Sequence, residues 1–121
     1  MKTFTTVEQS KRLLELGVKP ETADMTWIVF VDNSTRLMVA DDWMIEKMIE
    51  GGAQLVPCWS LGALFAIMQQ VEYNYPNLTK HPDTHEFFLV TSKYCTDFYD
   101  NPIDACMDMI EWGMKKWFNF K

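Results

Sequence analysis

Several signatures that assign a function directly are missing from this chain of 121 residues. It has no GxGxxG, GxxxxGK[ST] or GxSxG pattern, which excludes the commonest phosphate-binding and acyl-transfer motifs. No apolar run approaches the length of a membrane span, and the N-terminus lacks the apolar core of a signal peptide. The three cysteines are an odd number without CxxC spacing. They are therefore predicted to be buried free thiols in a reducing, cytoplasmic compartment.

Positive charge is also scarce. Eleven Lys and Arg residues face seventeen Asp and Glu residues, so the formal net charge is −6 and the sequence pI is about 4.8. Such a chain repels nucleic-acid phosphates and anionic membranes, which argues against both as partners. The same balance is compatible with a basic protein partner.

Apolar residues, by contrast, are plentiful. They make up 48% of the chain and include five Trp, eight Phe and nine Met, enough for a substantial core. The length predicts one domain that covers residues 1–121. Its predicted fold class is α+β, with the element order α-β-β-α-β-α-β-β-α and a single, mainly antiparallel sheet covered by helices.

Three helices have clear sequence signals. Residues 6–16 form an amphipathic pattern with a capping-box pair, Thr6 and Gln9, and with Gly17 at the C-terminal end. The stretch 57–68 is a proline break followed by the most apolar helix, capped by Ser60, and is predicted to organise the core around a stripe of Leu61, Leu64, Phe65, Met68 and Val71. The last helix begins at Asn101-Pro102-Ile103-Asp104, where N-cap, N1 proline and N3 acid agree.

The remaining elements follow from turn formers and β-branched runs. Residues 25–31 predict a central strand covered on both faces, and 36–40 predict its hairpin partner. Residues 42–50 predict a helix with Met44, Ile45, Met48 and Ile49 buried, and 53–56 predict a short strand. A long surface loop is expected over 72–84, and a second hairpin over 86–91 and 94–99.

Three blocks of sequence carry a resemblance. They are Glu8-Gln9-Ser10-Lys11 through Met25, Pro57-Cys58-Trp59-Ser60-Leu61-Gly62-Ala63-Leu64, and Asn101-Pro102-Ile103-Asp104-Ala105-Cys106 followed by Met109-Ile110 and Trp112. In these blocks the chain resembles a family of small uncharacterised proteins that are frequent in gut-bacterial genomes and their phages or mobile elements. The resemblance implies a single-domain, non-secreted accessory protein. It brings no known activity and no functional residue.

Two groups of residues are candidates for chemistry. His81, Asp83 and His85 place two imidazoles and a carboxylate close together, and such side chains bind zinc when the backbone converges them. Pro82 argues against the helical spacing of metalloprotease histidines, so solvated side chains are the alternative. Aspartates near predicted strand ends could also serve a metal-assisted hydrolase: Asp24, Asp32, Asp41, Asp42, Asp97 and Asp100.

Cys58 is the best candidate nucleophile, because a helix N-terminus lowers a thiol pKa. No base can be identified for it. The favoured interpretation is that Cys58 fills space beneath Trp59 while Ser60 caps the helix.

Three residues are candidates for protein contacts. Trp43 falls among charged neighbours on its helical wheel, and Trp is enriched at binding hot spots. On the last helix, Met109 and Trp112 share with Ala105 a third sector, well away from the core stripe and separate from the charged face. Either another part of the chain or the same helix of a second copy covers that sector. The sequence thus predicts a non-enzymatic interaction protein without cofactor, with a protein partner or a homodimer; the metal-assisted hydrolase is the alternative.

Overall fold

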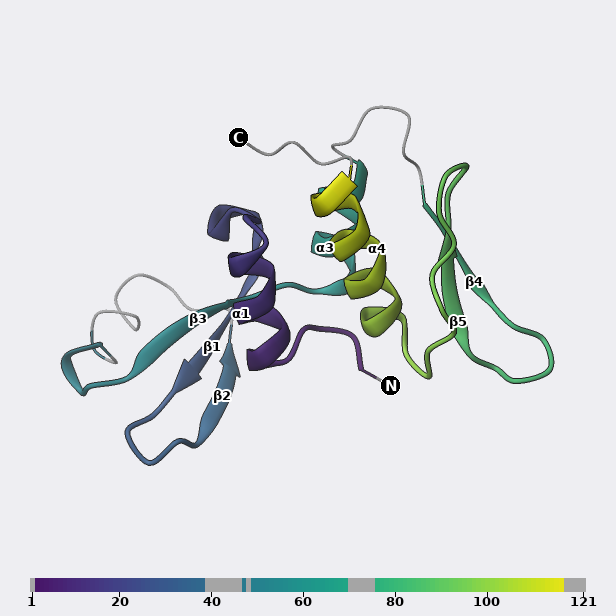
Figure 1. Ribbon diagram of the computed structural model, residues 1–121. Helices are drawn as coiled ribbons and strands as arrows, with labels where there is room; N and C mark the ends of the chain where they lie inside the picture. The colour runs from purple at the N-terminus through teal and green to yellow at the C-terminus, as the bar shows by residue number, and fades with distance from the viewer. Residues whose placement is uncertain (1, 39–46, 48, 70–75, 117–121) are drawn as a thin grey trace.

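The computed structural model describes residues 2–38, 47, 49–69 and 76–116 (Figure 1). The fold is α+β, as predicted. Its helices are α1 (Val7–Glu15), α3 (Leu61–Gln69) and α4 (Pro102–Lys116), with a short 3-10 turn at Pro20–Thr22. Its strands are β1 (Met25–Val29), β2 (Thr35–Met38), β3 (Gln54–Cys58), β4 (Asn77–Lys80) and β5 (Phe87–Val90).

The strands form two antiparallel sheets rather than the single sheet predicted. One has the order β2-β1-β3, and the other is the hairpin of β4 and β5. Figure 1 shows the helices α1, α3 and α4 between the two sheets. The second hairpin packs on α4 through β5 and does not extend the first sheet.

The predicted helix ends are confirmed by their hydrogen bonds. Thr6 and Gln9 form the capping box, and Gly17 adopts a φ of 96° while the Val18 amide donates to the Leu13 carbonyl. These are the two features of a Schellman ending, for which glycine is favoured because it lacks a Cβ. At α4, the Asn101 side chain accepts a 2.9 Å hydrogen bond from the amide of Asp104.

Pro57 does not break the chain as predicted. It lies within β3, opposite Thr26 of β1. A proline has no amide hydrogen to donate, and a strand with one free side tolerates it. The helix start that follows is as predicted, because the Ser60 hydroxyl accepts from the Ala63 amide at 3.2 Å.

The core lies among the three helices and β5. Helix α3 contributes Leu64, Ile67 and Met68, whereas Phe65 is only partly buried. Helix α4 contributes twice as many buried side chains: Ile103, Ala105, Cys106, Met107, Met109 and Ile110. Because α4 packs against both α3 and β5, it organises the core more than the stretch 57–68 does.

Two predictions about the first sheet and the following helix need correction. β1 is central, but only Ile28 is fully buried, and the other strand residues keep some exposure. Of the helix predicted over 42–50, the described residues 47, 49 and 50 are helical. Ile49 is 54% exposed, so it does not belong to a buried face. Trp43, Met44, Ile45 and Met48 lie outside the described residues.

The second hairpin is displaced from its predicted position. β4 falls inside the stretch expected to be a loop, and only Leu78 of this strand turns towards the core. The arm 94–99 runs beside β5 but is joined to it by isolated bridges, Val90 to Cys95 and Phe87 to Tyr99. The arm has one residue more than β5 between these bridges, so it bulges. The buried Thr96 hydroxyl accepts from the Leu89 amide within the bulge.

Candidate functional site

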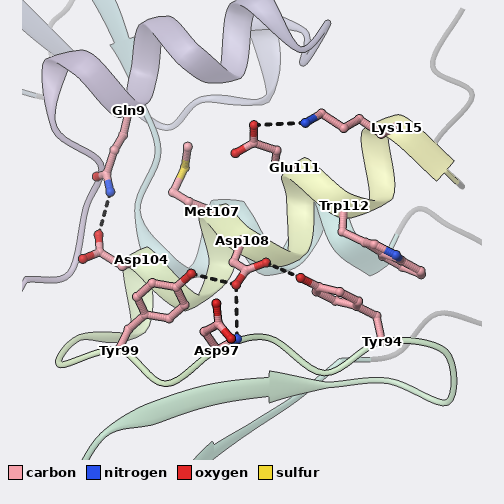
Figure 2. Close-up of a pocket in the computed structure, with 10 residues that line it drawn as sticks. All are labelled: Gln9, Tyr94, Asp97, Tyr99, Asp104, Met107, Asp108, Glu111, Trp112 and Lys115. Carbon is pink, nitrogen blue, oxygen red and sulfur yellow. Dashed lines mark hydrogen bonds and ion pairs between the residues drawn. The ribbon is translucent and has the colours of Figure 1, made fainter.

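An open groove of about 700 Å³ runs between α4 and the arm 94–99 (Figure 2). Helix α4 forms one wall, the arm forms the other, and α1 closes one end with Gln9. The lining side chains are mostly acidic or aromatic: Gln9, Tyr94, Asp97, Tyr99, Asp104, Met107, Asp108, Glu111, Trp112 and Lys115.

The α4 wall follows from helical spacing. Asp104, Asp108, Glu111 and Lys115 recur every three or four residues, so they share one face. The sequence predicts this face to be solvated and to hold a Glu–Lys pair. Lys115 and Glu111 do form an ion pair, at 3.5 Å. The face is not simply open to solvent, however, because the arm 94–99 stands opposite it.

Asp108 is the point at which the two walls meet. Its carboxylate accepts hydrogen bonds from the hydroxyl of Tyr94 at 2.6 Å, the hydroxyl of Tyr99 at 2.7 Å and the amide of Asp97 at 3.2 Å (Figure 2). The hydrogen bond to Asp108 and partial burial raise the pKa of Tyr94 to about 12. Burial and the same carboxylate raise the pKa of Tyr99. Both hydroxyls therefore remain protonated donors at neutral pH.

The other carboxylates of the α4 wall are tied to α1 and the N-terminal segment. Asp104 accepts from Gln9 at 2.6 Å, from Lys2 at 3.1 Å and from Asn101 at 2.8 Å. Burial opposes ionisation of Asp104, but the hydrogen bonds from these three side chains outweigh it and lower its pKa. Glu111 pairs with Arg12, and this hydrogen bond lowers the pKa of Glu111.

The aromatic part of the groove is a stacked pair. The rings of Tyr94 and Trp112 are nearly parallel, at 8°, with centroids 4.7 Å apart. Trp112 is partly exposed, and its indole lies at the same end of the groove as Lys115 (Figure 2). A large apolar ring thus lies beside a row of carboxylates.

The sector of α4 that carries Met109 and Trp112 is covered from within the chain. Ala105 and Met109 have no exposed surface, so neither is available to a second copy. Of the two alternatives for this sector, coverage by the same chain holds for these residues. The reason is that β5 and α3 pack on either side of α4. Trp112 alone reaches the groove, while Trp43 lies outside the described residues.

The histidine candidates lie in the turn between β4 and β5. The Nδ1 atom of His81 accepts from the amides of Asp83 and Thr84, at 3.2 and 3.3 Å, and its ring meets Phe98 edge-on. His85 is exposed and has a φ of 60°. His81 therefore shapes the turn. In the described part of the chain, no three His, Cys, Asp or Glu side chains come together as metal ligands.

Cys58 and Ser60 have structural roles. Burial is the main reason why the pKa of Cys58 is raised, the opposite of the lowering predicted for a helix N-terminus. The Cys58 thiol lies 3.4 Å from the Thr5 carbonyl, and the Ser60 hydroxyl donates to Asp24. The described candidate aspartates have separate surroundings: Asp24 supports Ser60, Asp32 accepts from the amide of Ser34 in the β1–β2 turn, and Asp97 lines the groove. Asp41 and Asp42 lie outside the described residues.

The sequence missed most of this groove. Asp108 follows the periodicity of an ordinary solvated helix face, and Tyr94 and Tyr99 follow that of a half-exposed strand. No local signal indicates that these side chains meet, since their contact depends on how the bulged arm packs on α4.

No helix within the described residues is long and apolar enough to cross a membrane. Comparisons of the chain with protein-family models, with curated proteins and with solved structures find no match.

Proposed function

We propose that this chain is a non-enzymatic interaction protein that binds a basic segment of a partner protein in the groove between α4 and the arm 94–99. The observation that carries the proposal is the partly exposed Trp112, stacked on Tyr94 beside the carboxylates of Asp97 and Asp108. Among the described residues, neither aspartate has a cation within ion-pair distance.

The charges of the groove support a cationic ligand. Its lining holds four carboxylates, Asp97, Asp104, Asp108 and Glu111, and one ammonium group, Lys115. Lys2 and Arg12 offset two of the carboxylates from outside the lining. Among the described residues, Asp97 and Asp108, next to the aromatic pair, are therefore the carboxylates of the lining that form no ion pair.

An aromatic face beside carboxylates suits lysine and arginine side chains. Their apolar stems pack against partly exposed aromatic surface while the charged head reaches a nearby carboxylate. Asp108 is held by two tyrosine hydroxyls and an amide, so its negative charge is already oriented before a ligand arrives. Preorganisation of this kind lowers the cost of binding.

The same hydrogen bonds argue for binding rather than catalysis. Proton transfer requires a group whose pKa lies near the working pH. In this groove the hydroxyls of Tyr94 and Tyr99 are held as donors and have raised pKa values, while Asp104 and Glu111 have lowered ones. These groups keep one protonation state around neutral pH.

The proposal also covers the class of partner and the cellular compartment of the protein. A negative net charge favours a basic protein over a nucleic acid or an anionic membrane as partner. The buried free thiols Cys58 and Cys106 suit a reducing, cytoplasmic compartment. We also propose an accessory role associated with phages or mobile elements, on the strength of the sequence resemblance alone. A homodimer is the other form of partner, and light scattering over a range of concentrations tests it.

Binding of labelled peptides tests the function directly. Peptides that alternate Lys or Arg with Gly should bind the protein, with an anisotropy change that weakens as salt is added. Replacement of their cations by Gln should abolish the signal. Asp97→Asn should reduce affinity about five- to tenfold, which corresponds to the loss of one charge contact of about 1 to 1.4 kcal/mol.

A charge-matched control distinguishes binding in the groove from a general effect of the net charge on affinity. Glu21 is an exposed acid in the 3-10 turn and does not line the groove. Glu21→Gln removes the same charge as Asp97→Asn and should leave affinity unchanged. Equal weakening by both variants would assign binding to the net charge, and absence of binding to every cationic peptide would refute the proposal.

A further inference from the structure

A second groove lies on the other side of the first turn of α1. It has a volume of about 440 Å³ and runs between the N-terminal segment with α1 on one side and the β1–β2 hairpin on the other. Its lining residues differ in character from those of the first groove: Lys2, Phe4, Thr6, Val7, Glu8, Lys11, Trp27, Val29, Asn33 and Thr35.

Apolar side chains form much of this lining. Phe4, Val7, Trp27 and Val29 come from three different elements, and all four are only partly buried. The rings of Phe4 and Trp27 meet edge-on, with centroids 5.8 Å apart. Partly exposed apolar side chains that gather in one groove can be covered further by an apolar ligand.

The lining is held in place by contacts beneath it. The Trp27 indole N–H donates to the Thr5 carbonyl at 2.8 Å, which orients the ring. The Thr5 amide donates to the Trp59 carbonyl, and the buried Thr5 hydroxyl contacts Ser10 and the Trp59 amide. Because these groups satisfy each other, the apolar surface is ready for a ligand and its polar atoms are already paired.

The second groove holds charges of both signs. Lys2, Lys11 and the acid Glu8 line it. Lys2 is paired with Asp104. Lys11 is exposed and forms none of the ion pairs found among the described residues, not even with Glu8 on the same helix.

We propose that this groove docks an apolar segment of a partner protein that carries an acidic side chain. The apolar side chains of the segment cover Phe4, Val7, Trp27 and Val29, and its carboxylate pairs with Lys11. The proposal rests on Lys11, which does not line the groove along α4, although Lys2 of this groove is ion-paired with Asp104 of that one.

Three labelled peptides of equal length test this proposal. They repeat the units Leu-Phe-Asp, Leu-Phe-Asn and Leu-Phe-Lys, each with a soluble tail, and binding is followed by anisotropy. The Asp peptide should bind the wild type at least tenfold more tightly than the Asn peptide. Lys11→Glu should weaken the Asp peptide by tenfold or more, and Lys11→Gln should weaken it by an intermediate factor.

Lys19→Glu is the matched control, since Lys19 is exposed, does not line the groove and undergoes the same charge change. It should leave binding of the Asp peptide unchanged. Equal weakening by Lys11→Glu and Lys19→Glu, equal binding of the Asp and Asn peptides, or no binding of the Asp peptide would each overturn the proposal. Circular dichroism confirms that the variants remain folded.

Two further measurements distinguish an acidic partner segment from other possible occupants of the groove. A dimer seen by light scattering that Lys11→Glu dissociates would make the occupant a second copy, which overturns the partner segment. The Lys peptide reports on the groove along α4 instead, so Asp97→Asn should weaken it while Lys11→Glu should not. The two variants thereby show which of the two binding proposals fails.

Discussion

The hydroxyl of Tyr94 donates a 2.6 Å hydrogen bond to the carboxylate of Asp108, and this contact joins the arm after β5 to the middle of α4. Tyr99 donates to the same carboxylate from the other end of the arm, at 2.7 Å. One carboxylate therefore holds both ends of a bulged segment against the helix. The contact that docks the arm also builds the wall of the groove.

Tyrosine titration tests this arrangement. Of the four tyrosines, Tyr94 should titrate near its raised pKa of about 12 and Tyr99 should also titrate late. An ordinary tyrosine titrates near pH 10. Absorbance at alkaline pH measures phenolate formation, and Asp108→Asn should move the late phase towards pH 10. Titration of all four tyrosines together near pH 10 would contradict the hydrogen bonds to Asp108.

The raised pKa of Tyr94 also predicts how the stability of the fold changes at high pH. Because the folded-state pKa of Tyr94 lies above its unfolded value, its contribution to stability is complete below about pH 10. That contribution is lost as the pH rises towards about 12. Urea unfolding at several pH values should show a steeper decline for the wild type than for Tyr94→Phe.

The lowered pKa of Asp104 predicts the opposite pH dependence, a loss of stability at low pH. Its folded-state pKa is lowered, so it stabilises the fold above the unfolded value of about 4. This stability is lost as the pH falls through the folded-state pKa. Asp104→Asn should therefore flatten the acid limb of the stability curve, while Glu21→Gln, in an exposed turn, should leave it unchanged. Parallel acid limbs for Asp104→Asn and the wild type would argue against the contacts with Lys2 and Gln9.

The three cysteines should differ in reactivity. Cys95 is exposed, contrary to the prediction that all three thiols are buried, whereas Cys58 and Cys106 are buried. Burial raises the pKa of Cys106 to about 12. A thiol reagent should modify one cysteine per native chain rapidly and the other two only on unfolding. Cys95→Ser should remove the rapid phase. Rapid modification of a second thiol would mean that the core opens more readily than this packing suggests.

Two neighbouring positions on α3 should respond differently to truncation. Leu64 has no exposed surface, so Leu64→Ala should cost about 2 to 5 kcal/mol from lost burial and cavity formation. Phe65, which the sequence places in the same core stripe, is only partly buried, so Phe65→Ala should cost less. Chemical denaturation of both variants measures the difference. A larger loss at Phe65 would place that ring, and not Leu64, at the centre of the core.

Helix ends were well predicted, because each depends on a few neighbouring residues. Thr6 and Gln9, Gly17, Ser60 and Asn101 act on backbone groups within one turn. The hydrogen bonds that they make are available in almost any tertiary setting. The α+β class was likewise predictable from the alternation of such segments.

Strand partners were less predictable. β4 was hidden in a segment with only one inward apolar residue, Leu78, and the arm 94–99 reads as a regular strand although it bulges. The separation into two sheets was not predicted either. A strand pattern states which residues face inward, but not which neighbour supplies the hydrogen bonds.

The amino-acid sequence by itself determined the helix caps, the acidic net charge and the charged face of α4, but not the buried side of α3, where Ile67 is covered and Phe65 only partly. Only the tertiary structure decided that α4 is the centre of the core, that Met109 is covered from within the chain, and that Asp108 meets Tyr94 and Tyr99. Helix caps arise between residues one turn apart, where chain geometry fixes the distance. The groove walls belong to segments that come together only when the chain packs. Contacts between their side chains therefore cannot be predicted from the local spacing of residues.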